Sequence, residues 1–481
     1  MTSRNRQSWT QLPRQMLPFA DAASVDLPLS QILRLSLFQV SVGMASVMLL
    51  GTLNRVMIVE LSVSAMIVAF MIALPVLIAP FRAVLGFRSD THRSAIGWKR
   101  VPYIWFGSLF QMGGLAIMPF ALIVLSGDQT IGPSWAGEVL AALAFLMTGL
   151  GLHMTQTAGL ALASDRADDE TRPRVVSLLY VMYLLGMGIS AVIIGWLLRD
   201  FSNLTLIRVV QGAALTGLVL NLIALWKQEH VRPMSLQERN RPRPAFSSAW
   251  SDFMSTPSAG RLIVVVFGGT LAFNMQDVLL EPYGGEVLGL SVAKTTWLTA
   301  AWSIGALIGL AFAARRLRLG VLPHRLMVIG LGLGIIAFAA VIVSHPIGSP
   351  AVFFAGAMLI GAGAGLFAVA TLITAMNLPV VNDAGRGLAL GAWGAAQATA
   401  AGCAIALGGS LRDGVNMLAL RGAFGADLAG PATGYASVYM TEIAALIITL
   451  ILLRPLVRHA RRTATLSHPR SGGIQLADFP M

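Results

Sequence analysis

Near the middle of the chain, residues 227–248 read KQEHVRPMSLQERNRPRPAFSS. They open the longest polar stretch between apolar segments, residues 227–261, which is rich in proline and arginine. Sequence of this composition does not build a packed core, so we interpret 227–261 as a flexible linker. It separates two apolar regions, 31–226 and 262–456, and the chain is therefore predicted to fold as two halves.

Each apolar region divides into six segments that are long enough to cross a membrane. The hydrocarbon core of a bilayer is about 30 Å thick, and a helix needs about 20 apolar residues to span it. The segments are continuously apolar rather than alternating, which favours helices over a β-barrel. The sequence predicts an all-α integral membrane protein with about 12 transmembrane helices, at residues 34–54, 61–81, 101–126, 136–162, 175–198, 206–226, 262–282, 291–314, 326–345, 351–376, 388–410 and 435–456.

The composition agrees with a membrane protein and argues against several enzyme classes. Charged residues make up 12% of the chain, about half of the share of roughly 25% in soluble proteins. The single cysteine, Cys403, excludes an intrachain disulfide framework and a thiolate-rich metal site. No Walker A or HExxH sequence is present, and the GAGAG at 361–365 lies in an apolar segment, where it favours close helix packing. We expect no enzymatic activity.

Lysine and arginine are distributed unequally between the two sets of loops. Of the 34 in the chain, 28 fall on the side that holds the linker and both ends of the chain, an arm at 1–30 and a basic tail at 457–481. Cytoplasmic loops carry the positive charge in membrane proteins, so both termini are predicted to be cytoplasmic. The N-terminus is polar up to about Asp26, and no cleavable signal peptide is expected. The other side holds only six: Arg55, Arg199, Arg208, Lys294, Arg412 and Arg421.

The net charge of +12 could indicate a nucleic-acid partner. Here, however, the basic residues lie in short loops beside apolar segments, at the level of lipid headgroups. We therefore expect anionic lipids as their partners, and no nucleic acid.

The two halves repeat features of each other. Asp169 and Arg172 follow the fourth segment, and Asp383 and Arg386 follow the tenth, with the same spacing in the same loop of each half. Basic loops likewise follow the second and the eighth segments. This pattern indicates a parallel six-helix repeat, which is the plan of the major facilitator fold.

The loop after the second segment resembles a motif of the major facilitator superfamily, G-x-x-x-D-(R/K)-x-G-R-R-(K/R). Thr91 stands where a cation is expected, and four additional residues precede the second glycine. One interpretation is a cytoplasmic gate, and the other is an ordinary positively charged loop. The residues that match the motif are Gly86, Asp90, Gly97, Lys99 and Arg100.

The seventh segment contains the densest set of polar residues within a span, FNMQDVLLEPYGGE at 273–286. Asn274, Asp277 and Glu281 are spaced i, i+3 and i+7, so they are predicted to share one helix face before Pro282 and the following glycines bend or end the helix. Ionisable residues within a span are functional candidates by default. They could couple protons or substrate, ligate a hard cation such as magnesium, or simply be hydrated at the external surface. The identity of any metal stays open.

His153 is the only histidine well inside a predicted span. A neutral imidazole can ligate the central magnesium of a chlorophyll or bacteriochlorophyll. The more common role of such a residue is a hydrogen bond between helices, for which Gln156 and Thr157 are candidate partners.

Four segments carry a more specific resemblance: GTLNRVMIVEL at 51–61, the basic loop and third span at 81–122, SDRADDETRPRVVSLLYVMYLLGM at 164–187, and FNMQDVLLEPYGGEVLGLSVAKTT at 273–296. They resemble the PucC/LhaA family of purple photosynthetic bacteria, the bacteriochlorophyll-delivery branch of the major facilitator superfamily. The resemblance covers about residues 30–456.

The resemblance implies a membrane assembly factor for light-harvesting antenna complexes in the inner or intracytoplasmic photosynthetic membrane. Such a protein would bind bacteriochlorophyll, or deliver it to antenna polypeptides during insertion, in contact with pigment-synthesis or insertion machinery. The length and the long arm favour the LhaA type, which serves the core antenna. The antenna served, the pigment ligand, the oligomeric state and the choice between transport and holding stay open.

Two other hypotheses compete with this one. The chain could be a proton-coupled secondary transporter of a small solute that uses Asp277 or Glu281. It could also be a regulatory membrane protein that binds partners but no pigment.

Overall fold

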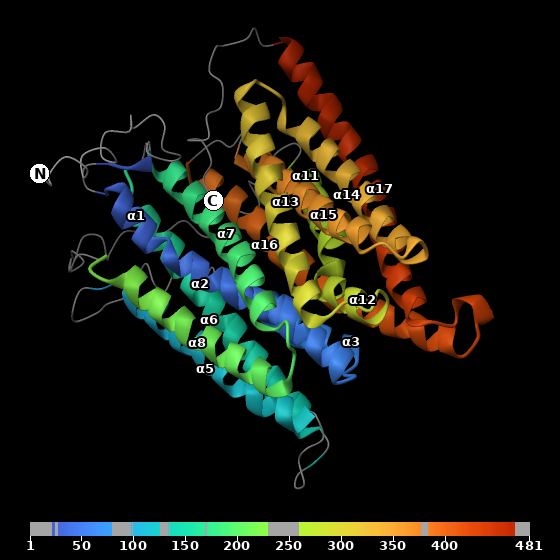
Figure 1. Ribbon diagram of the computed structural model, residues 1–481. Helices are drawn as coiled ribbons and strands as arrows, with labels where there is room; N and C mark the ends of the chain where they lie inside the picture. The colour runs from blue at the N-terminus through green and yellow to red at the C-terminus, as the bar shows by residue number, and fades with distance from the viewer. Residues whose placement is uncertain are drawn as a thin grey trace, which may run out of the picture.

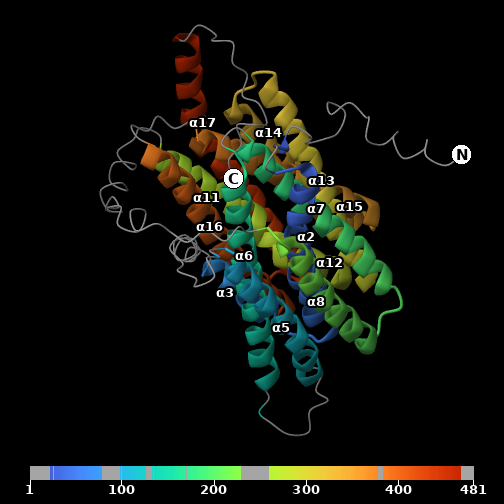
Figure 2. The ribbon, with the colours of Figure 1, turned by 90° about the vertical axis from the view of Figure 1, so that its left-hand side faces the viewer.

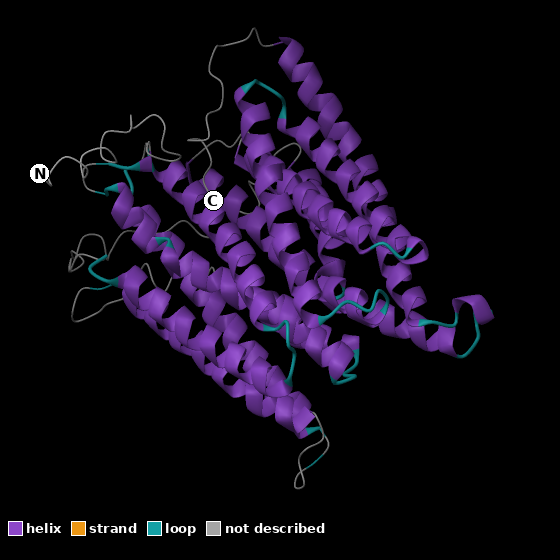
Figure 3. Ribbon diagram, viewed as in Figure 1, coloured by secondary structure: helices purple, strands orange, loops and turns teal. Residues whose placement is uncertain are grey.

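The structure is a computed structural model that describes residues 22–24, 27–78, 98, 100–125, 133, 135–168, 171–228, 259–376 and 383–466. Every regular element in these ranges is helical (Figure 3). Most of the predicted linker and arm and part of the tail lie outside the described residues.

The N-terminal half begins with a long, irregular helix. It consists of α1 (Leu29–Leu35), α2 (Leu37–Ser46) and two π-helical stretches, η3 (Val47–Leu53) and η4 (Val56–Glu60). The remaining helices of this half are α3 (Ala65–Leu77), α5 (Val101–Leu125), α6 (Ala136–Arg166), α7 (Arg172–Leu197) and α8 (Asn203–Leu225).

The C-terminal half also begins with an irregular helix, in which the 3-10 turn η6 (Met275–Val278) separates α11 (Ala259–Asn274) from α12 (Leu280–Glu286). The remaining elements are α13 (Val292–Arg318), α14 (Pro323–Ile347), α15 (Pro350–Met376), α16 (Asp383–Leu420), η7 (Ala426–Leu428) and α17 (Pro431–Leu466).

Ten stretches of helix within the described residues are long and apolar enough to cross a membrane. The first runs from Leu29 to Glu60. α3 is a shorter apolar helix at the predicted second span, and α16 lies at the predicted eleventh. The predicted class, an all-α multi-pass membrane protein, is confirmed, while the count of about 12 spans stays a prediction.

Each half packs mainly within itself. In the N-terminal half, α2 lies against α7 and α8, and α5 lies against α6. In the C-terminal half, α15 lies against α13 and α14, and α17 lies against α11 and α14. The expected close packing at 361–365 is confirmed, because a Cβ atom at Gly361 would lie 2.0 Å from the carbonyl oxygen of Trp302 in α13.

Two pairs of helices make the most extensive contacts between the halves in the described residues. α3 packs against α16, and α7 packs against α13 (Figures 1 and 2). The contact between α3 and α16 is close, since a Cβ atom at Gly409 would lie 2.6 Å from the carbonyl oxygen of Ala65.

The start of α1 and the end of α17 lie toward the same end of the bundle (Figure 1). We name it the terminal end. At the opposite end, short turns connect η4 to α3 and α12 to α13.

Candidate functional site

A cavity of about 380 Å³ lies between the two halves. Its wall comes from α2, η3, α3, α6 and α7 on one side and from α11, η6 and α16 on the other. Most of the residues that line it are apolar, including Leu49, Ile72, Phe145 and Ile405. The polar residues of the wall are Ser46, His153, Gln156, Tyr183, Asn274, Asp277 and Gln397.

Three residues predicted from sequence meet in this cavity. His153 lies on α6, a half-buried position in the N-terminal half, whereas Asn274 and Asp277 come from the C-terminal half. Sequence spacing could not place His153 beside Asn274 and Asp277, because His153 belongs to the other half of the fold.

Sequence reasoning missed two other polar members of the wall. The hydroxyl of Tyr183 donates a hydrogen bond to Ser46 Oγ at 3.2 Å, which joins α7 to α2. Neither residue has a sequence signal beyond being polar within an apolar segment, and such residues are more often involved in helix packing.

Asp277 owes its position to the irregular backbone of η6. The amide nitrogen of the Gln276 side chain donates to Asp277 Oδ1 at 2.5 Å, and the backbone N–H of Gln276 donates to Glu442 Oε1 at 2.7 Å. Glu442 lies on α17 and is fully buried. A helix broken inside a membrane needs side chains to satisfy its freed backbone groups, and Glu442 does this from within the same half.

The N-terminal half provides a hydrogen-bond partner for a second backbone group of η6. Asn54 donates from its side-chain amide to the carbonyl oxygen of Val278 at 2.8 Å, across the interface between the halves. The turn that presents Asp277 to the cavity is therefore held by one residue of each half.

Glu281 does not line the cavity that Asn274 and Asp277 reach, and the common helix face of the three residues stays a prediction. The 3-10 turn that precedes Glu281 winds more tightly than an α-helix. Glu281 is buried and accepts a hydrogen bond from Thr299 Oγ1 at 2.6 Å. A Cβ atom at Gly51 would lie 2.3 Å from Glu281 Oε1, so the carboxylate fits against the bare backbone of η3.

The seventh helix ends at Glu286, directly after the glycine pair, as predicted. The sequence did not reveal the 3-10 turn at Met275–Val278, which interrupts the helix before Pro282. Pro282 lies in the first turn of α12, where proline has no hydrogen bond to disrupt.

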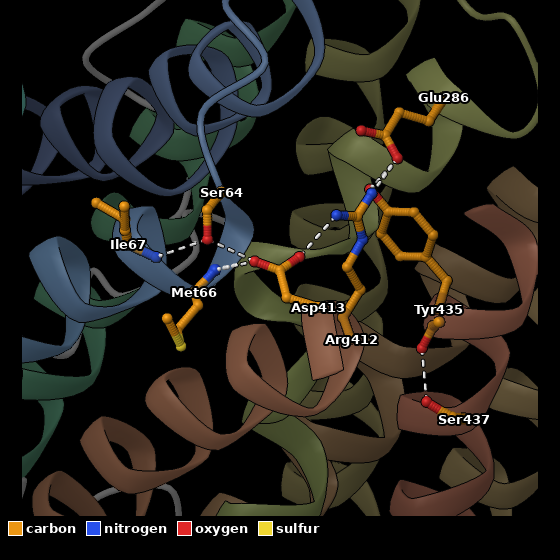
Figure 4. Close-up of polar contacts among 9 residues, drawn as sticks. Ser64, Met66, Ile67, Glu286, Arg412, Asp413, Tyr435 and Ser437 are labelled. Carbon is orange, nitrogen blue, oxygen red and sulfur yellow. Dashed lines mark hydrogen bonds and ion pairs between the residues drawn. The ribbon is translucent and has the colours of Figure 1, made fainter. Parts of the chain in front are cut away.

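A polar cluster lies at the opposite end of the bundle and comprises Ser64, Glu286, Arg412, Asp413 and Tyr435 (Figure 4). Arg412 forms ion pairs with Glu286 and, at 2.7 Å, with Asp413 Oδ1. Asp413 Oδ2 accepts from Ser64 Oγ at 2.6 Å and from the backbone N–H of Met66 at 2.8 Å. Because Ser64 belongs to the N-terminal half, this cluster ties the start of α3 to α16 and to the end of the seventh helix.

Comparison with known proteins places this arrangement in a family. The family model described as PUCC protein matches residues 52–461, which is most of the chain. This chain belongs to the PUCC protein family. It is 63% identical over 464 residues to a Rhodobacter capsulatus protein named "Uncharacterized protein in puhA-bchM intergenic region", covering 96% of this chain and 97% of that relative. It is 54% identical over 407 residues to "Protein PucC" of Rhodovulum sulfidophilum, covering 84% and 89% of the two chains.

The fold of this PUCC family member matches that of solved transporters. A bacterial homologue of the human lysosomal transporter Spinster, solved in an inward-facing and unoccupied conformation, superposes with a TM-score of 0.65. That match covers 88% of this chain and 95% of the transporter at 14% identity. It confirms the predicted major facilitator-like fold. The predicted LhaA type within the family stays a prediction.

Most of the predicted gate loop lies outside the described residues, namely Gly86, Asp90, Gly97 and Lys99. Arg100 is described and buried, and its Nε donates to Asp165 Oδ2 at 2.9 Å. This ion pair joins the start of α5 to the end of α6 at the terminal end, so Arg100 connects two helices of one half.

The repeated Asp-x-x-Arg pairs are described only in part. Asp169 lies outside the described residues, and Arg172 donates from Nε to the carbonyl oxygen of Ser164 at 3.0 Å. Asp383 and Arg386 lie in the first turns of α16, and the structure describes only their backbone. The pairing of these residues stays a prediction.

The magnesium interpretation of the seventh helix finds no support in the described ranges. There, no group of three or more His, Cys, Asp or Glu side chains is placed to hold a metal ion. The metal interpretation stays a prediction. The alternative interpretation, that Glu281 and Glu286 are merely hydrated, is wrong for Glu281, which is buried, whereas Glu286 is partly exposed and ion-paired to Arg412.

Proposed function

We propose that this protein is a membrane assembly factor for light-harvesting antenna complexes, and that it binds bacteriochlorophyll as cargo in the cavity between its halves. The observation that carries the proposal is the cavity itself, an apolar chamber with a histidine and a few hydrogen-bonding side chains on its wall. Membership of the PUCC family supports the photosynthetic setting. We place the protein in the inner or intracytoplasmic membrane with both termini cytoplasmic, on the basis of its charge distribution.

The wall of the cavity matches the chemistry of this pigment. A bacteriochlorophyll offers a magnesium ion that takes an axial ligand, ring carbonyl groups that accept hydrogen bonds, and a large apolar surface. His153 provides an imidazole, Asn274 and Gln397 provide amide donors, and the remaining wall is mainly apolar.

The volume limits how the pigment can be held. Small-molecule cavities usually measure about 300–1,000 Å³, and about 380 Å³ is near the lower limit. A whole bacteriochlorophyll with its isoprenoid tail is larger than this. The ring would therefore enter as the halves separate, with the tail among the surrounding lipids, and release to an antenna polypeptide would follow the same route.

The test is an absorbance spectrum of the protein purified in mild detergent from its native pigmented membrane. We expect near-stoichiometric bacteriochlorophyll on the wild type and loss of most of it in His153→Ala or Asp277→Asn. His345→Ala is the matched control, because His345 is exposed at the end of α14, away from the cavity. Well-folded protein without pigment in the wild type would overturn the proposal of a stable carrier.

A second candidate function, proton-coupled transport of a small solute, has its own support. Asp277 faces the cavity, Glu281 and Glu442 are buried nearby on the same helix and on α17, and the fold matches that of transporters. In this case, purified protein would carry no pigment. Uptake into vesicles would depend on a proton gradient and would be abolished in Asp277→Asn but unaffected in His345→Ala.

A further inference from the structure

Two arginines from different helices approach each other at the terminal end of the N-terminal half. Arg34 lies in the last turn of α1, and Arg166 is the last residue of α6. Arg166 donates from Nη2 to the side-chain oxygen of Gln31 at 2.8 Å and from Nη1 to that of Gln228, just after α8. Gln31 and Arg34 are three residues apart on α1, so Arg34 lies on the helix face that meets Arg166.

The partners of Arg166 hold it in place without neutralising its charge. Gln31 and Gln228 are neutral amides, and Gln228 is itself fixed by a hydrogen bond from Nε2 to the carbonyl oxygen of Gln31 at 3.3 Å. Arg34 is close enough for its positive charge to act on Arg166. Its Nε atom is buried and has no hydrogen-bond partner within the described part of the chain.

No described carboxylate compensates these two charges. Asp165, the nearest acidic residue along α6, pairs with Arg100 instead. In the described residues, the ion pairs of the chain involve Arg55, Arg100 and Arg412, and neither Arg34 nor Arg166 takes part in one. Two partly buried cations without an anion are unfavourable, because they repel each other and lose hydration.

We propose that Arg34 and Arg166 form a binding site for a phosphate group. The planar guanidinium group presents paired N–H donors that match the oxygens of a phosphate, and two of them acting together recognise it strongly. The amides of Gln31 and Gln228 orient one guanidinium in advance and leave its remaining donors for the ligand. The site lies where the first span begins and the fourth and sixth spans end, at the level of lipid headgroups.

Two kinds of molecule carry a phosphate group that could reach this site. One is the phosphodiester of an anionic phospholipid in the adjacent leaflet, and the other is a free phosphate compound in the aqueous phase. This site lies apart from the cavity and does not depend on the function proposed for it.

The test uses the full-length protein in detergent with two probes, short-chain phosphatidylglycerol and inorganic pyrophosphate. Binding would be followed by native mass spectrometry and by the shift in Tm. We expect Arg34→Gln to weaken binding roughly ten- to a hundredfold, the effect of losing one charge-assisted hydrogen-bonding group. Arg34→Gln breaks no hydrogen bond in the described structure, so its fold is not at risk.

Matched variants complete the experiment. Arg315→Gln is the control, because Arg315 is an exposed arginine at the end of α13, at the same end of the molecule. Arg166→Lys keeps the charge but loses the planar guanidinium group, and we expect it to bind phosphate less tightly than the wild type.

The two probes distinguish the sources of the phosphate. Binding of phosphatidylglycerol alone would identify a lipid site, and binding of pyrophosphate with the same dependence on Arg34 would identify a site for soluble phosphates. Equal binding of both probes by the wild type and Arg34→Gln would overturn the proposal.

Discussion

The first helix of the N-terminal half and the first helix of the C-terminal half are predicted to hold the same place in a six-helix repeat, and both are irregular. The former becomes π-helical at Val47–Leu53 and Val56–Glu60. The latter tightens into a 3-10 turn at Met275–Val278. Both distortions occur toward the opposite end of the bundle, where the two helices meet.

The two helices differ in the chemical groups that they place at their mutual contact. The N-terminal helix presents bare backbone and donors at Gly51 and Asn54, whereas the C-terminal helix presents carboxylates at Asp277 and Glu281. Identical chemistry in both repeats would place carboxylates against each other and destabilise the interface. The comparison teaches that the two first helices are complementary where they meet: one carries carboxylates, and the other donates a hydrogen bond at Asn54 and leaves space at Gly51.

Among the variants that test this comparison, Arg412→Ala is expected to lower the free energy of unfolding the most. Arg412 is buried and holds the end of the C-terminal first helix through Glu286, and its loss would leave the partly buried carboxylates of Glu286 and Asp413 without a counter-charge. We expect a loss of about 3–5 kcal/mol in unfolding free energy, measured by denaturant titration in detergent. Arg421→Ala, at an exposed position after α16, should leave the stability unchanged. Equal stability of the two variants would show that the polar cluster does not anchor the helix.

A smaller effect is expected from Gly51→Ala, which tests the fit between the two first helices. The added Cβ atom would collide with the buried carboxylate of Glu281, whose shift would disturb its hydrogen bond from Thr299, and we expect a loss of about 2–3 kcal/mol. Gly212→Ala on α8 is the control, since no atom lies within 4 Å of its Cβ position. That control should be neutral or slightly stabilising, because alanine reduces the entropy of the unfolded chain. If Gly51→Ala behaves like the control, the two helices are not in close contact in the membrane.

The smallest of these effects is expected from Asn54→Ala, which removes the hydrogen bond from the N-terminal half to the 3-10 turn. The carbonyl oxygen of Val278 would lose its partner in a buried position, at about 2 kcal/mol. The same turn keeps its bond to Glu442, so we expect a shifted Tm without loss of the fold. Asn203→Ala, an exposed residue at the start of α8, is the control. An unchanged Tm in Asn54→Ala would contradict a role of the N-terminal half in holding the turn.

The candidate residues were predictable to different degrees. His153, Asn274 and Asp277 could be selected because polar side chains within apolar segments are costly and therefore informative. Glu442 lies near the start of the last predicted span, and nothing along the chain shows that it accepts a hydrogen bond from Gln276. Arg34 and Arg166 belong to ordinary basic loop ends in sequence, and their proximity is visible only where α1, α6 and α8 converge.

Amino-acid order alone was enough to establish a multi-pass helical protein with two similar halves, because hydropathy and helix length depend on local sequence. It was also enough to reveal the PUCC family. Tertiary structure decided which polar residues face one another: it brought His153 and Asp277 into one cavity and set Glu281 against Thr299 and the backbone of Gly51. The physical reason is that helical periodicity assumes a regular helix, whereas the 3-10 turn at Met275–Val278 is stabilised by hydrogen bonds from side chains of both halves, which are distant in sequence.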